Sequence, residues 1–228
     1  MGHFYSGKPV ITDGLILYMD AGNPKSFFSD TWKDLKGSYD GSITDVTQSD
    51  GYYEFAEIDE PEIVHSEIEF DSASSWTFSQ WQYIPSGSPT AWNAFCGTNL
   101  GVNGYWMWHT TGTLFFYLDY YDDSGGYDTY AQDWVMTFPV DEWFNITVSY
   151  DGLTSSTTGS MNGDQIIESQ LMLWSPRPIT SFKFKYVGNN GSSRYFTGRL
   201  ATFQVWDRKL TQNEILNNFN ALKSRFGL

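Results

Sequence analysis

The sequence predicts an all-β protein: a two-sheet antiparallel β-sandwich that ends in one short C-terminal helix. Hydrophobic and polar residues alternate along many short segments, which is typical of strands with one face on a core and one in water. Aromatic residues, which favour strands, form 18% of the chain, and 21 glycines supply its tight turns. At 228 residues, the chain is expected to form one domain.

Six segments show the alternation most clearly, and each is predicted to be a strand. They are residues 15–19, 76–79, 114–120, 144–150, 182–186 and 201–205. Clusters of Gly, Asn, Asp and Ser separate them and favour turns, because these residues tolerate positive φ or bond their own backbone. Asn162-Gly163 fits a two-residue hairpin turn. Neither a linker nor an internal repeat divides the chain, so residues 13–210 are expected to form a single sandwich.

The C-terminal residues 211–228 are predicted to form a helix packed on this sandwich. Thr211 and Glu214 have the spacing of a capping box, in which each side chain bonds a backbone N–H that the helix leaves free. One apolar face follows at helical spacing, formed by Ile215, Phe219 and Leu222. Residues 1–12 precede the first strand, and we expect them to form an arm that docks on a neighbouring subunit or another protein.

Charge and composition argue against several classes of protein. The chain has 13 Lys and Arg against 27 Asp and Glu, a net charge of −14, which argues against binding to nucleic acid. Its one cysteine, Cys96, cannot form an internal disulfide, and one cysteine with three histidines argues against a zinc site. No apolar run approaches the roughly 20 residues that cross a bilayer, so we expect no membrane insertion.

Four blocks of sequence carry a resemblance to a known family. They are Asp13–Ser26, Trp32–Gly41, Trp143–Gly163 and Phe196–Ile215. In this order they resemble the opening strand, the following W-x-D-L stretch, the central hairpin, and the last strand and helix of laminin-G-like domains. These domains belong to the concanavalin A-like lectin and glucanase superfamily, so the resemblance implies a jelly-roll sandwich of the concanavalin A-like kind.

One acidic segment resembles a catalytic motif of the same superfamily. Glu57, Asp59 and Glu62 have the spacing of the E-x-D-x-x-E strand of retaining glucanases, whose carboxylates act as nucleophile, electrostatic partner and general acid. Here Glu60 stands where that motif has an apolar residue, and Pro61 is poorly tolerated inside a central strand. We therefore interpret the segment as a solvated acidic loop and expect a protein that is not an enzyme.

Two further groups are candidates for ligand binding. An oxygen-rich cluster is suited to Ca²⁺, which laminin-G-like relatives often hold at a sandwich rim, and it consists of Asp119, Asp122 and Asp123. Aromatic residues that can stack on sugar rings are concentrated nearby: Trp106, Trp108, Tyr117, Tyr120, Tyr121 and Tyr127. The same aromatic residues could instead fill the core or a subunit interface, where Trp and Tyr are also enriched. No cofactor is expected to be required, and calcium is the ion that the sequence suggests.

Residues 218–228 are similar to the endings of laminin-G-like virion proteins of tailed bacteriophages, which implies a place in a virion. We expect a non-enzymatic virion structural protein, a capsid decoration or fibre-type component, that displays a lectin-like β-sandwich and helps attachment to host glycans. Its expected partners are other virion proteins, further copies of itself and host surface polysaccharide. We expect it on the virion surface, after assembly in the host cytoplasm. The alternatives are a stand-alone or tail-borne carbohydrate-binding adhesin and, less favoured, a β-glucanase.

Overall fold

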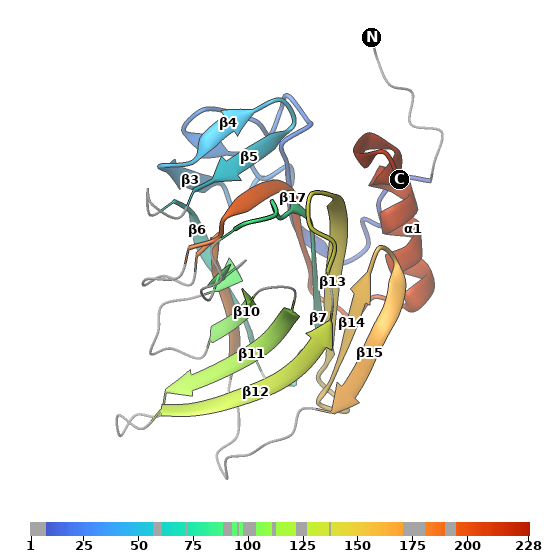
Figure 1. The fold of residues 1–228 in the computed structure, drawn as a ribbon. Coiled ribbons are helices and arrows are strands. Elements are labelled where there is room, and N and C mark those ends of the chain that lie inside the picture. The colour runs from blue at the N-terminus through green and yellow to red at the C-terminus, as the bar shows by residue number, and fades with distance from the viewer. Residues whose placement is uncertain are drawn as a thin grey trace.

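The computed structural model describes residues 8–56, 61–71, 73–88, 93–94, 96–97, 104–110, 113–121, 127–136, 138–170, 181–189 and 195–228. Between residues 93 and 136, the structure describes the strands by their backbone and their pairing. The architecture is a β-sandwich with one short helix near the C-terminus, so the predicted fold class is confirmed (Figure 1).

The first layer is an eight-stranded antiparallel sheet in the order β15-β14-β13-β7-β17-β5-β4, with β1 paired to β17. Its strands are β1 (Leu15–Asp20), β4 (Thr47–Ser49), β5 (Tyr52–Phe55), β7 (Trp76–Tyr83), β13 (Trp143–Asp151), β14 (Ser156–Met161), β15 (Asp164–Gln170) and β17 (Gly198–Trp206). Asn162 and Gly163 join β14 to β15 with φ of 52° and 82°. Both values are positive, as the predicted two-residue hairpin turn requires.

The second layer consists of two sheets that lie side by side. A five-stranded sheet has the order β2-β3-β6-β16-β9, and a four-stranded sheet has the order β12-β11-β10-β8. Their strands are β2 (Thr31–Trp32), β3 (Gly41–Thr44), β6 (Glu62–Asp71), β8 (Asn93–Ala94), β9 (Cys96–Gly97), β10 (Gly104–Thr110), β11 (Thr113–Tyr121), β12 (Tyr127–Met136) and β16 (Ser181–Val187). Because β10 runs close to both β9 and β16, the four-stranded sheet extends the five-stranded one (Figure 1).

Alternate residues of the facing strands form the core between the layers. On β13, Ile146 and Val148 are no more than 1% exposed, as their alternation with polar residues predicts. Trp76 of β7 reaches across the sandwich, and its ring centroid lies 5.5 Å from that of Phe182 and 5.2 Å from that of Phe184 on β16. Burial of such aromatic side chains is the main favourable contribution to folding.

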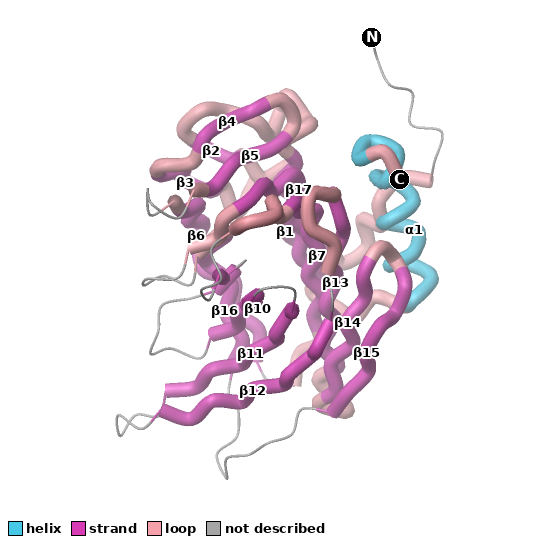
Figure 2. Tube along the Cα trace, in the orientation of Figure 1, coloured by secondary structure: helices cyan, strands magenta, loops and turns pink. Residues whose placement is uncertain are grey.

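The helix α1 (Gln212–Leu222) and the 3₁₀ turn η2 (Lys223–Phe226) cover the outer face of the eight-stranded sheet (Figure 2). Trp81 of β7 points to this face and stacks on Phe226, with ring centroids 4.1 Å apart. At the start of α1, Thr211 and Glu214 form the predicted capping box. A bidentate ion pair with Arg208 holds the pKa of Glu214 down to about 2. Among the described residues, no helix is long and apolar enough to cross a membrane.

The described part of the N-terminal segment is held by its own chain. The Ile11 N–H donates to Asn218 Oδ1 at 2.8 Å, and the Trp206 indole N–H donates to the Ile11 carbonyl at 2.9 Å. Asn217 Nδ2 donates to the Pro9 carbonyl at 2.9 Å. Residues 8–12 therefore join α1 to the sandwich. Residues 1–7 lie outside the described part, and docking of the arm on a neighbour stays a prediction.

Candidate ligand-binding sites

The register of the β10–β12 sheet brings most of the predicted sugar-binding residues to one face. Trp106 pairs with Tyr117, and the next pairs along this face include Gly104 with Asp119. On the other side of β11, Tyr121 pairs with Tyr127. Directly paired residues of antiparallel strands share a face, and so do residues two apart along one strand. We call this the aromatic face, and it contains Trp106, Trp108, Phe115, Tyr117, Asp119, Tyr121 and Tyr127.

The opposite face of the same sheet has a different composition. It holds Tyr105, Met107, His109, Leu114, Phe116, Leu118, Tyr120, Asp128, Tyr130 and Gln132. Tyr120, which the sequence grouped with the sugar-binding candidates, therefore lies on the other face from Tyr121.

The predicted calcium ligands lie at or beyond the end of β11. Asp119 is on the aromatic face, whereas Asp122 and Asp123 lie outside the described residues. Among the side chains that the structure does describe, no three His, Cys, Asp or Glu residues are close enough together to hold a metal ion. The calcium site therefore stays a prediction.

The acidic segment that resembles the glucanase motif crosses the start of a strand. Glu57 and Asp59 lie outside the described residues, and Pro61 precedes β6, which begins at Glu62. The Glu62 carboxylate accepts a hydrogen bond of 3.0 Å from Asn189 Nδ2. Because Pro61 is not part of a strand, Glu62 does not share one uninterrupted strand with the other two acids. This arrangement differs from a glucanase motif, in which a single strand aims the carboxylates at one cleft.

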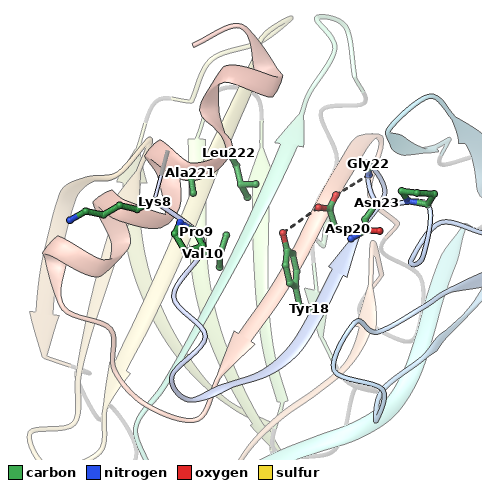
Figure 3. Close-up of a pocket in the computed structure, with 10 residues that line it drawn as sticks. Lys8, Pro9, Val10, Tyr18, Asp20, Gly22, Asn23, Ala221 and Leu222 are labelled. Atoms are coloured by element: carbon green, nitrogen blue, oxygen red, sulfur yellow. Dashed lines mark hydrogen bonds between the residues drawn. The ribbon is translucent and has the colours of Figure 1, made fainter. Parts of the chain in front are cut away.

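A pocket of about 580 Å³ lies between residues 8–10, the end of β1 with the turn after it, and the end of α1 (Figure 3). It is lined by Lys8, Pro9, Val10, Tyr18, Asp20, Gly22, Asn23, Pro24, Ala221 and Leu222. Figure 3 shows the Asp20 carboxylate between the Tyr18 hydroxyl and the Gly22 backbone, which donate to it at 3.2 and 2.8 Å. Val10, Ala221 and Leu222 give the pocket an apolar wall from the N-terminal segment and the helix.

Asp20, which lines this pocket, also forms an ion pair with the C-terminal part of the chain. Arg225 of η2 binds Asp20 at 2.5 Å, and their side chains are 15% and 10% exposed. The Asp20 carboxylate thus has three partners within the fold. We conclude that this pair ties the end of β1 to the C-terminus. Sequence reasoning missed the pair, because 205 positions separate its members and no local spacing connects them.

Comparison with known proteins agrees with this fold. A family model described as the concanavalin A-like lectin/glucanases superfamily, of the laminin G type, matches residues 48–216. The binding domain of Paraclostridial Mosquitocidal Protein 1 is similar in structure, with a TM-score of 0.66, 19% identity, and coverage of 91% of this chain and 52% of that one. Trypanosoma rangeli sialidase is similar with a TM-score of 0.66 and 9% identity, and the match covers 94% of this chain and 34% of the sialidase. The receptor binding domain of botulinum neurotoxin C/D mosaic serotype gives 0.65 at 12% identity, with 92% and 51% covered.

These structural similarities, all below 20% identity, establish the shared fold. The chain spans about half the length of the two toxin domains and about a third of the sialidase. No curated protein matches the sequence significantly. The family model covers roughly three quarters of the chain, including most of the eight-stranded sheet. The chain therefore belongs to the concanavalin A-like lectin/glucanases superfamily.

Proposed function

We propose that this chain is a non-enzymatic, glycan-binding β-sandwich whose binding surface is the aromatic face of β10–β12. The observation that carries the proposal is the register, which gathers two Trp, three Tyr and Asp119 on one face of a sheet. Aromatic rings can pack against the apolar C–H face of a sugar, while a carboxylate accepts hydrogen bonds from its hydroxyls.

An observation from known proteins supports a binding role for this fold. Two of the similar structures are named as a binding domain and a receptor binding domain, so the fold serves recognition in those proteins. The superfamily also contains enzymes, and the segment around Glu62 lacks their one-strand arrangement.

Replacing Trp106 or Trp108 with alanine is expected to weaken glycan binding about tenfold or more. Loss of one stacked ring removes about 1.4 kcal/mol or more of binding free energy, which corresponds to that factor. The measurement is a glycan array on the whole chain, followed by calorimetric titration of the best oligosaccharide, with calcium and with EDTA. Phe28→Ala is the matched control, because Phe28 is an aromatic residue that is 44% exposed and lies outside this sheet.

Three results would contradict the proposal. An array without any bound glycan in either buffer would remove glycan binding as the function. Equal affinity of the Trp106→Ala, Trp108→Ala and Phe28→Ala variants would remove the aromatic face as its site. Release of reducing ends from a β-glucan, lost in Glu62→Gln, would make the protein an enzyme. Loss of glycan binding in EDTA would instead support the calcium site with Asp119.

We further propose that the sandwich is displayed on the surface of a tailed-phage virion, as a capsid decoration or fibre-type component that associates with its own copies. The support is the resemblance of residues 218–228 to the endings of such proteins, together with the net charge of −14. An acidic surface repels nucleic acid and keeps unassembled copies in solution. Mass spectrometry of purified particles is expected to find the chain in fixed stoichiometry. Its presence only in the particle-free fraction would favour the stand-alone adhesin.

A further inference from the structure

We propose that a second pocket, on the outer face of the eight-stranded sheet, is a separate subsite for one neutral pyranose ring. The pocket has a volume of about 500 Å³ and is lined by Gly22, Asp50, Gly51, Tyr52, Trp143, Arg225 and Phe226. This volume falls within the roughly 300–1,000 Å³ of small-molecule sites. The inference takes its ligand class from the proposed function, but the site shares no residue with the aromatic face.

Three parts of the chain build the pocket. Asp50 and Gly51 form the turn between β4 and β5, and Tyr52 begins β5. Trp143 is the first residue of β13, and η2 adds Arg225 and Phe226. These segments come together because η2 packs on Trp81, whose ring stacks on Phe226. The pocket walls are thus fixed by the sheet and by the docked C-terminus rather than by one loop.

Tilted aromatic rings form one wall of the pocket. The Trp143 ring centroid lies 5.0 Å from that of Phe226 at an interplanar angle of 44°, and 5.8 Å from that of Tyr52 at 58°. All three residues are half-buried, so each ring is held by its neighbours and keeps part of its surface in solvent. Such a preorganised aromatic wall binds an apolar sugar face at a low cost in side-chain entropy.

Polar groups stand beside this wall. Arg225 donates to Asp20 Oδ1 and to the Gly51 carbonyl, each at 2.5 Å. A guanidinium has five N–H donors, so these two bonds fix its position and leave others for a ligand hydroxyl. Gly22 makes room for this placement, because a Cβ there would lie 2.3 Å from Arg225 Cζ. The exposed Asp50 carboxylate supplies acceptors at the rim.

The charges of the pocket favour a neutral sugar over an acidic one. Asp20 compensates the positive charge of Arg225 within the fold. Asp50 then leaves the pocket with a net negative charge, on a chain whose total is −14. A carboxylate-bearing sugar would meet this like charge, whereas hydroxyls of a neutral hexose accept from Arg225 and donate to Asp50. Selection against acidic sugars is therefore part of the proposal.

The test uses the whole chain labelled with ¹⁵N and follows the indole N–H signal of Trp143, assigned through Trp143→Phe. The probes are the methyl glycosides of glucose, galactose and mannose, and glucuronate as the acidic counterpart. At least one neutral glycoside is expected to shift the Trp143 signal, with an affinity at least tenfold above that of glucuronate. Asp50→Lys, at an exposed position, is expected to reverse this preference without affecting the fold.

Several outcomes decide the matter. Asp50→Ala is expected to lower the affinity for the neutral glycoside, measured from the Trp143 signal, several-fold. Phe28→Ala is expected to leave this affinity unchanged. No shift of the Trp143 signal with any neutral glycoside would overturn the inference, even if variants of Trp106 show that the aromatic face binds glycans. Equal binding of glucuronate to the unmodified chain would also overturn it. A shift at Trp143 that persists in Trp106→Ala would support two separate sites.

Discussion

Replacing Asp34 with alanine is expected to lower the free energy of unfolding by about 3–5 kcal/mol, since four partly buried hydrogen bonds to one charged group are lost together. Asp34 is 5% exposed. Its Oδ1 accepts the N–H groups of Tyr18 and Lys36 at 2.8 and 2.9 Å, and its Oδ2 accepts those of Ser38 and Tyr39 at 3.0 and 3.2 Å. Alanine leaves all four donors without this acceptor.

Urea unfolding, followed by tryptophan fluorescence, measures the effect. The stability of the Asp34→Asn variant is expected to lie between that of Asp34→Ala and that of the unmodified chain. The asparagine amide keeps one acceptor oxygen but turns an NH₂ group toward two of the donors. Asp30→Ala is the matched control, since Asp30 is an exposed aspartate four positions earlier and should change stability by less than about 0.5 kcal/mol. Equal stability of the Asp34→Ala and Asp30→Ala variants would show that the carboxylate does not organise the turn.

The role of Asp34 also explains why the block Trp32–Gly41 resembles a family motif. Trp32 is fully buried in the core, and Asp34 fixes the backbone that follows it and links this backbone to β1. The resemblance of this block rests on its residue types alone. The structure adds the physical reason for the aspartate, which is to satisfy backbone groups that no strand partner reaches.

The sandwich itself was predictable, because the side-chain alternation of a strand is a local property. Ile146, Val148 and Tyr150 are at most 2% exposed, as their spacing indicates. The alternation was harder to follow on β7, where Gln80 and Gln82 succeed Trp76 and Phe78 on the inward face. Both glutamines are fully buried and hydrogen-bonded to each other, so polar residues at core positions hid the second half of this strand.

The candidate sites depend on contacts that sequence spacing does not encode. Tyr120 and Tyr121 are neighbours, and only the register of β11 with β10 and β12 shows which of them joins Trp106. The outer pocket brings together Asp50, Trp143 and Arg225, which are far apart in the chain. Residues of this kind are brought together by sheet pairing and helix docking, and both are long-range properties.

Stability is expected to fall by up to about 3 kcal/mol as the pH drops from 6.5 toward 4, through His65. His65 of β6 is 3% exposed, between the rings of Tyr39 and Phe203. Burial lowers its pKa from 6.5 to about 4, against the opposing effects of a hydrogen bond with the Ser66 carbonyl and of the Asp34 charge. Among the described residues, His65 Nε2 has no hydrogen-bond partner, so no acceptor would stabilise the imidazolium that forms when the ring is protonated.

The sign of the effect follows from proton binding. Between pH 6.5 and 4, His65 is protonated in the unfolded chain and neutral in the folded chain, so acid favours unfolding. Above pH 6.5 His65 is neutral in both states, and it makes no contribution to the pH dependence of stability. Urea unfolding across this range is expected to show a shallower dependence of stability on pH in His65→Leu than in the unmodified chain, with the remaining slope due to carboxylates such as Glu214. The leucine variant starts from a lower stability at pH 7, because its Ser66 bond is gone, but only the slope tests the linkage. If the free energy of unfolding changed with pH in the same way in both proteins, His65 would be protonated in the folded chain as easily as in the unfolded chain.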